Sequence, residues 1–250
     1  ELSYLAVFVL IIFLSSKEYF KILINNGFRP NYNLGVFLSV IIFVTTYFYA
    51  SKESLIGVHF VLVPILPLVC LSALYSSNNN ETLSNVSVTF FGILYISLPI
   101  SLLNFIVFNE YSYNSIYLMA TLLFLWNSES AAYFGGSLFG RKKLFESVSP
   151  MKTWEGVISG LLANVILAYL IHQFIWTSFQ TFTFWVLFSM VVLVSGIFGD
   201  LFESLLKRNF NLKDSGNKLP GHGGFLDRFD SFFFVIPYVY FYLKIINQIT

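Results

Sequence analysis

Charge is the scarcest feature of this 250-residue chain. Only 11% of its residues are Asp, Glu, Lys or Arg, whereas 56% are hydrophobic and 20% are aromatic. Soluble domains carry about a quarter charged residues, so the composition excludes an ordinary water-soluble protein. We therefore predict an all-α fold, a polytopic transmembrane helix bundle, because backbone amides in hydrocarbon need partners within their own helix.

Cysteine is nearly absent as well. The single cysteine, Cys70, lies in an apolar run, so no disulfide can form within the chain. A small packing residue is the simplest interpretation of it. The sequence also lacks internal repeats, and the Asn78-Asn79-Asn80 run is a short polar turn between two apolar stretches rather than a low-complexity domain.

Apolar runs predict about eight spans. They lie at residues 2–14, 34–50, 55–74, 86–108, 115–128, 156–176, 181–198 and 231–249. The first run is short for a span of about 20 residues, but it lacks the basic flank and cleavage site of a signal peptide. Because the chain starts at Glu1 inside this run, without a methionine, we expect further residues upstream, with room for another span.

Basic residues are distributed unevenly between the connections. With eight spans, one side of the membrane carries the connections at residues 15–33, 75–85, 129–155 and 199–230. These hold twelve of the fourteen Lys and Arg residues, and only Lys52 and Lys244 lie elsewhere. The positive-inside rule places this side in the cytoplasm, so the two largest polar segments face the compartment that contains nucleotides.

The segment 199–230 is where charge gathers. It holds all four aspartates, five of the fourteen Lys and Arg residues, and one of the three histidines. If the seventh helix continues past the membrane surface, helical spacing puts several of these side chains on one face. They are Asp200, Ser204, Lys207 and Arg208, with Glu203 beside them. Carboxylates of this kind suit Mg²⁺, which usually binds through one or two carboxylates plus substrate phosphates.

The middle of this segment has the composition of a loop. Turn formers follow Asp214 and Leu219, and the stretch ends at His222-Gly223-Gly224. Two glycines without Cβ let a phosphate approach backbone amides closely, ahead of a helix start. Asp227 and Asp230, three residues apart, are expected to project from one side of that helix.

Structural alternatives exist for several of these residues. Asp227 could be a helix N-cap, with Arg228 and Asp230 as interfacial anchors, and Lys207-Arg208 could be a positive-inside flank. Anchoring needs a few cations and no aspartates, whereas this segment carries five carboxylates around a Gly-Gly turn. The joint pattern therefore favours a functional site.

Three motifs carry a family resemblance. The longest reads Ser204-x-Leu206-Lys207-Arg208-x4-Lys213-Asp214-x-Gly216-x2-Leu219-Pro220-x-His222-Gly223-Gly224-Phe225-x-Asp227-Arg228-Phe229-Asp230. The others are Ser149-Pro150-Met151-Lys152-Thr153-Trp154-Glu155-Gly156 and Ala132-Tyr133-x-x-Gly136-x-x-Phe139-Gly140-Arg141. Together they are similar to the signatures of the phosphatidate cytidylyltransferases, or CDP-diacylglycerol synthases, and the resemblance covers roughly residues 86–249.

Two positions depart from the family pattern. Met151 stands where the family usually has a first lysine, so Lys152 must carry that charge alone. Glu129 stands where the family usually has aspartate, so the carboxylate is one methylene longer. Structural roles are again open: Arg141, Lys142 and Lys143 could determine topology, and Ser149-Pro150 could be an N-cap and first helical residue.

The resemblance implies transfer of the cytidylyl group of CTP to phosphatidic acid, giving CDP-diacylglycerol and pyrophosphate. It implies Mg²⁺, with a second cation such as K⁺, held by Asp200, Asp227 and Asp230, and catalysis by these aspartates with Lys207. The residues expected to bind substrate are Glu129, Ser149, Lys152, Ser204, Arg208, Lys213, Asp214, His222, Gly223, Gly224 and Arg228. No protein nucleophile is required, so direct attack by the lipid phosphate is expected.

The same resemblance implies an organisation and a location. Residues 1–85 would form N-terminal transmembrane helices, and residues 86–250 a catalytic transmembrane domain with cytoplasmic segments 129–155 and 199–230. The expected partners are CTP, phosphatidic acid, membrane lipids and a second copy of the chain in a homodimer, without nucleic acid. We expect a bacterial-type plasma (inner) membrane with the active site facing the cytoplasm.

Other functions stay open at this point. A transporter of an anionic or metal-coupled solute would need intramembrane ionisable residues, for which His59, with Pro64 and Pro67 in the same span, and Glu129 are the candidates. A relative without activity is a second alternative, which the two departures favour and the intact aspartates oppose. A third is an enzyme of the same family acting on an isoprenoid-type lipid phosphate.

Overall fold

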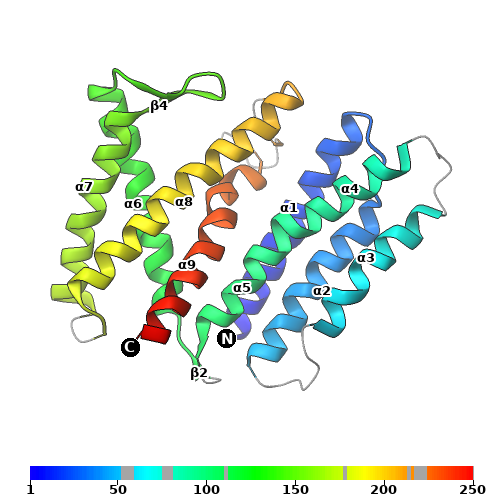
Figure 1. The fold of residues 1–250 in the computed structure, drawn as a ribbon, viewed down its shortest axis with the longest axis horizontal. Helices are drawn as coiled ribbons and strands as arrows, with labels where there is room; N and C mark the ends of the chain where they lie inside the picture. Colours follow the sequence, from blue (N-terminus) through cyan, green and yellow to red (C-terminus); the bar gives the residue numbers. More distant parts are fainter. Residues whose placement is uncertain are drawn as a thin grey trace. The chain divides into compact units, whose positions relative to one another are not determined.

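The structure is a computed structural model (Figure 1). It describes residues 1–51, 59–74, 81–109, 112–176, 179–212, 215–216 and 224–249. Packing divides the chain into two units. The first unit consists of Glu1–Asn114 with Leu212–Phe229, and the second of Ser115–Asn211 with Asp230–Thr250. The functional boundary expected at residue 85 concerns activity rather than packing, and it stays a prediction.

Among its described residues, the first unit is mainly helical and has one short hairpin. Its elements are α1 (Leu2–Asn25), α2 (Tyr32–Ala50), α3 (His59–Leu74), α4 (Thr82–Gly92), the π-helical turn η2 (Ile93–Ser97), α5 (Leu98–Val107), β1 (Phe108–Asn109), β2 (Ser112–Tyr113) and the 3₁₀ turn η4 (Leu226–Arg228). Strands β1 and β2 pair antiparallel, with Phe108 opposite Tyr113. The π-helical turn precedes Pro99, whose missing N–H interrupts the regular helical bonding.

The second unit carries the longest helix, α8 (Phe182–Asn209). Its elements are α6 (Ile116–Phe139), β3 (Lys143–Phe145), β4 (Ser149–Thr153), α7 (Trp154–Leu170), the π-helical turn η3 (Ile171–Ile175), α8 and α9 (Asp230–Ile249). Strands β3 and β4 form an antiparallel hairpin between α6 and α7. The structural alternative of a helix start at Ser149-Pro150 is wrong, because Thr153 caps α7 instead: its Oγ1 accepts the Gly156 amide at 3.2 Å.

The helices confirm the all-α prediction, and within the described ranges eight continuous helical segments match the eight predicted spans. Four of these segments are long and apolar enough to cross a membrane by length and composition: Tyr32–Ala50, Thr82–Val107, Trp154–Ile175 and Phe182–Asn209. Large apolar side chains such as Trp126 and Ile166 are exposed along the helices. Such surfaces suit lipid, which makes the chain an integral membrane protein.

Three helices are longer than the apolar runs that predicted them. Helix α8 continues to Asn209, as predicted from the helical spacing of its charged residues. Helices α1 and α6 continue to Asn25 and Phe139, so the connections expected from residues 15 and 129 begin as helix. The reason in α6 is packing rather than apolarity. Helix α7 approaches it so closely that a Cβ on Gly156 would lie 2.7 Å from the Ala132 carbonyl oxygen.

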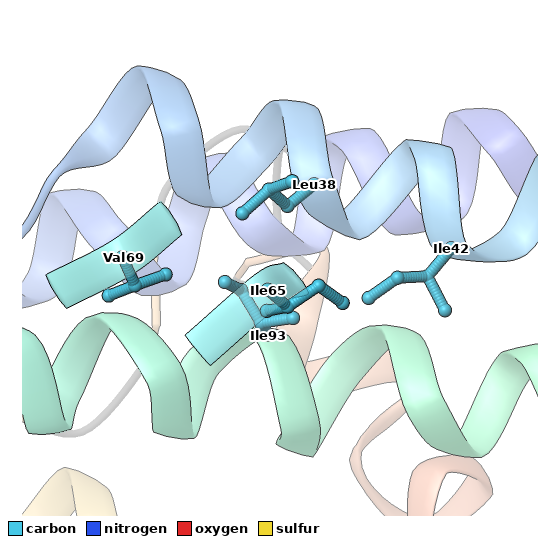
Figure 2. Close-up of a cluster of buried hydrophobic side chains, with 5 residues drawn as sticks. All are labelled: Leu38, Ile42, Ile65, Val69 and Ile93. Carbon is cyan, nitrogen blue, oxygen red and sulfur yellow. The ribbon is translucent and has the colours of Figure 1, made fainter. Parts of the chain in front are cut away.

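Each unit has an apolar core crossed by polar contacts between helices. In the first unit Leu38, Ile42, Ile65, Val69 and Ile93 pack between α2, α3 and η2 (Figure 2). Nearby, buried asparagine contacts join α1, α2 and α5. Tyr4 Oη donates to Asn104 Oδ1 at 2.9 Å, and Asn104 Nδ2 donates to Thr46 Oγ1 at 2.7 Å.

The second unit has a matching contact between asparagines. Asn127 Nδ2 of α6 donates to Asn164 Oδ1 of α7 at 2.9 Å, and Asn164 is fully buried. Paired amides of this kind satisfy polar groups among apolar helices and fix the register of α6 against α7. The hairpin β3–β4, which joins these two helices, is thereby held at one end of the unit.

Candidate active site

Helix α8 presents the charged face that its spacing predicts. Ser204 Oγ donates a hydrogen bond to Asp200 Oδ1 at 3.3 Å, one helical turn apart. Lys207 Nζ pairs with Glu203 Oε2 at 2.6 Å, and Glu203 is only 1% exposed. Arg208 lies exposed at the next position. The predicted cluster is therefore real, with Lys207 bound to Glu203 by an i, i+4 ion pair.

The hairpin strand β4 meets this face. Lys152 Nζ forms an ion pair of 2.5 Å with Asp200 Oδ2, and both side chains stay partly accessible. This contact joins the segments 129–155 and 199–230, which the sequence placed on one side of the membrane. The motif at residues 149–156 thus meets the charged face of α8, on which the longest motif begins, at Lys152 and Asp200.

Strand alternation explains why Met151 departs from the family pattern without disturbing this contact. Neighbouring residues on a strand point to opposite faces. Lys152 points to Asp200, whereas Met151 is 83% exposed. A lysine at position 151 would therefore extend into the surroundings, and Lys152 alone supplies the cation next to Asp200.

Glu155 holds the two residues that precede β3 in place. Its carboxylate accepts the backbone amides of Arg141 at 3.1 Å and Lys142 at 3.2 Å. The Trp154 amide donates to the Lys142 carbonyl at 3.0 Å. Glu155 therefore has a structural role in the T-W-E-G element, and it fixes the start of β3 against the first turn of α7.

Asp230 lies beside Asp200 because α8 and α9 approach closely at Gly199. A Cβ on Gly199 would lie 2.9 Å from the Ser231 Cα and 3.1 Å from the Asp230 carbonyl oxygen. Desolvation, followed by repulsion from the Asp200 carboxylate, raises the pKa of Asp230 to about 7. Two carboxylates that repel each other in this way form a pair that an oxygen-preferring cation would stabilise.

Asp227 organises a different part of the motif. Its Oδ2 accepts the Ser215 amide at 2.9 Å and the Gly224 amide at 2.7 Å. Both amides precede Asp227 in the chain, so this role differs from an N-cap, which binds amides that follow. The expectation that Asp227 and Asp230 share one helix is wrong, because Asp227 lies in the 3₁₀ turn η4 and α9 begins at Asp230.

Glu18 is the residue that the sequence reasoning missed. It lies on α1, is 3% exposed, and accepts the Leu226 amide at 2.8 Å through Oε2. Ser215 Oγ donates to the same oxygen at 3.5 Å. The one local signal is that its neighbours Tyr19 and Phe20 are aromatic, which is unusual company for a carboxylate.

The remaining predicted residues are distributed as follows. Ser149 lies half-buried on β4, Glu129 is exposed on α6, and Arg228 is exposed in η4. Gly224 is buried against Ser215. Lys213, Asp214, His222 and Gly223 lie outside the described residues, as does the side chain of His59.

A metal site was expected at Asp200, Asp227 and Asp230. Among the residues that the structure describes, no group of three or more His, Cys, Asp or Glu side chains is arranged to hold a metal ion. Mg²⁺ in nucleotide enzymes usually takes one or two carboxylates, with phosphates and water completing its coordination. The Asp200–Asp230 pair fits that smaller requirement.

The chain belongs to the cytidylyltransferase family, whose sequence profile matches residues 1–246. The family therefore extends over the first three spans, beyond the range 86–249 in which the motifs lie. Among its relatives, a phosphatidate cytidylyltransferase of Bacillus subtilis (strain 168) is 42% identical over 135 residues, which are 54% of this chain and 50% of that protein.

Two further relatives carry the same name. The phosphatidate cytidylyltransferase of Haemophilus influenzae is 38% identical over 139 residues, 54% of this chain and 48% of its own length. That of Staphylococcus aureus (strain COL) is 42% identical over 123 residues, 48% of this chain and 46% of its own. The chain thus spans about half the length of the curated relatives it matches.

Proposed function

We propose that this chain transfers the cytidylyl group of CTP to phosphatidic acid, releasing pyrophosphate and forming CDP-diacylglycerol. The observation that carries the proposal is the ion pair between Lys152 and Asp200, because it brings the motif at residues 149–156 to the charged face of α8, on which the longest motif begins. The relatives named phosphatidate cytidylyltransferase support the choice of substrates.

The reaction joins two anions. An oxygen of the phosphatidic acid phosphate attacks the α-phosphorus of CTP, the bond from that phosphorus to the bridging oxygen breaks, and pyrophosphate leaves with the bond electrons. Catalysis of such a step consists mainly of alignment and charge neutralisation. A bound Mg²⁺ would supply Lewis-acid stabilisation of the transferring phosphoryl group. Asp200 and Asp230 are the residues that would hold it.

The cations of the site would bind the phosphates. Lys152 is partly accessible beside Asp200, so a substrate phosphate can take over part of its ion pair. Lys207 and Arg208 follow on the same helix, and Lys207 is held in place by Glu203. Arg228 and Lys213 are further candidates from the sequence motif. The expected metal-binding role of Asp227 stays part of the proposal.

Direct attack is consistent with the residues present near Asp200. The side chains there are carboxylates, lysines and the Ser204 hydroxyl, which donates to Asp200. A phosphate oxygen of the lipid already carries negative charge, so the reaction requires no nucleophile from the protein. We assign the nucleophile to the lipid phosphate itself.

Location and assembly complete the proposal. The charge asymmetry of the connections supports an active site on the cytoplasmic side of a bacterial-type inner membrane, where CTP is available. The lipid substrate would then keep its acyl chains among the helices while its phosphate reaches the site. A homodimer is proposed from the family resemblance.

The proposal is tested with labelled CTP. Membranes that contain the protein, Mg²⁺ and phosphatidic acid should convert label into chloroform-soluble lipid. A polyprenyl phosphate offered in place of phosphatidic acid tests the isoprenoid alternative in the same assay. Label that stays in the aqueous phase with both lipids, while the protein is inserted and folded, would contradict the proposal.

A further inference from the structure

The first helix of the chain reaches the signature segment through one buried carboxylate. Glu18 lies on α1, nearly 200 residues before Ser215 in the sequence, and its side chain is almost completely buried. Its neighbours Ser15 and Ser16 on the same helix are buried as well. Burying a carboxylate is costly unless it is hydrogen-bonded, so its contacts carry information about its role.

The hydrogen bonds of its Oε2 oxygen go to the segment 215–226. Glu18 Oε2 accepts the backbone amide of Leu226 at 2.8 Å and faces the Ser215 hydroxyl at 3.5 Å. The two residues lie at opposite ends of the segment. One carboxylate oxygen of α1 therefore ties both ends of the segment to the same point.

The glycines of the signature fit around this point. A Cβ on Gly224 would collide with Ser215 Oγ and lie 2.9 Å from Glu18 Oε2. A Cβ on Gly216 would lie 3.4 Å from Glu18 Oε1. Gly224 is thus required by close packing against Ser215 and Glu18, whatever role it has toward a phosphate.

Asp227, which follows this segment directly, binds two further backbone amides. It accepts the Ser215 and Gly224 amides, while Glu18 accepts the Leu226 amide. Three backbone amides of the signature are therefore held by two carboxylates. The Asp227 carboxylate belongs to the signature itself, whereas the Glu18 carboxylate comes from the first helix.

We propose that Glu18 is a positioning residue for this enzyme: its buried carboxylate holds Ser215 and Leu226 in the conformation that Asp227 and the substrate phosphates require. The inference rests on the proposed function for its effect on turnover. The tie itself is a structural statement that can be measured without substrate.

The experiment compares Glu18→Ala with Glu18→Gln in the full chain in detergent micelles. Gln keeps an acceptor oxygen at the same reach, whereas Ala removes it. Glu81→Ala is the matched control, since Glu81 is an exposed carboxylate of the same unit. Two quantities are measured for each variant: hydrogen exchange of the Leu226 amide, with α2 amides as the reference, and kcat and KM for CTP.

We expect Glu18→Ala to speed exchange of the Leu226 amide, with α2 unchanged, and to lower kcat by about 10- to 100-fold, the range typical of residues that orient a metal or substrate ligand. Glu18→Gln should recover most of both quantities, and Glu81→Ala should alter neither. A pure stability role predicts faster exchange in α2 and Leu226 together, with normal kcat per folded molecule.

The inference is overturned if Leu226 exchange in Glu18→Ala equals that of the unsubstituted protein, if α2 loosens equally, or if kcat is unchanged. Should the unsubstituted protein fail to release pyrophosphate from CTP, the proposed function fails. The exchange comparison then still decides whether Glu18 holds the segment.

Discussion

Two pairs of carboxylates, one pair in each unit, have different roles in this protein. In the first unit Glu18 and Asp227 accept backbone amides and are occupied in holding a loop. In the second unit Asp200 and Glu203 pair with the side chains of lysines. Backbone contacts fix a conformation, whereas a lysine at a partly accessible carboxylate can exchange partners with an incoming phosphate or cation.

The difference separates loop geometry from charge within the segment 199–230. This segment runs through both units, so its acidic residues look equivalent in the sequence. The structure assigns Asp227 to loop geometry and Asp200 to an accessible charged pair. Substitutions should therefore fail in different ways in the two units.

The largest effect is expected for Asp200→Asn. Losing the charge removes the partner of Lys152 and half of the carboxylate pair with Asp230, so turnover should fall roughly 1,000-fold or more. Conversion of labelled CTP into lipid measures it. Glu146→Gln, at an exposed carboxylate of the same hairpin as Lys152, should keep normal activity. Activity of Asp200→Asn within about tenfold of normal would remove Asp200 from the site.

Asp227→Asn should have the next largest effect. Asn keeps one acceptor oxygen and turns an NH₂ group toward amides that need acceptors, so turnover should fall about 100-fold. The distinguishing measurement is hydrogen exchange at Ser215 and Gly224, which should speed up here and stay unchanged in Asp200→Asn. Equal rates of hydrogen exchange at these two amides in both variants would contradict the assignment of Asp227 to loop geometry and Asp200 to charge.

Lys152→Ala tests the Lys152–Asp200 ion pair by removing its cation. Removing the cation should lower kcat/KM for CTP by about 10- to 100-fold, because a charge-assisted contact to phosphate is lost. Lys152→Arg should keep a substantial part of the activity. The neighbouring Met151→Lys is the control, and since this side chain is exposed it should change kcat/KM less than about twofold. A gain of about tenfold in Met151→Lys would show that position 151 reaches the substrate.

Ser204→Ala should give the smallest effect. Its hydrogen bond to Asp200 is long, at 3.3 Å. A contact of this kind contributes about 0.5–1 kcal/mol, so kcat should fall only about two- to fivefold. Steady-state kinetics at saturating CTP measure it. A loss as large as that of Asp200→Asn would mean that the serine contacts substrate directly.

Much of the fold follows from the sequence because hydrocarbon permits few solutions. Apolar runs located the helical segments, and helical spacing predicted the Asp200–Ser204 contact on α8. The extension of α6 to Phe139 could not be read this way, since it depends on small residues packing against α7. The composition of α6 alone does not show that α7 packs against it.

The site shows the same limit. A family motif identified Lys152 and helical spacing identified Asp200, but their ion pair depends on how the β3–β4 hairpin meets α8. Glu18 was missed because its partners, Ser215 and Leu226, are far away in the sequence. Spacing rules work within an element, and they say nothing about a tertiary hydrogen bond to a backbone amide.

The central claim is tested most directly by pyrophosphate release from purified protein with CTP and Mg²⁺, measured with and without phosphatidic acid, beside Asp200→Asn. We expect that pyrophosphate release requires the lipid, that one CDP-diacylglycerol forms for each pyrophosphate, and that both products are absent with the variant. Lipid-independent release, or equal release by Asp200→Asn, would contradict it.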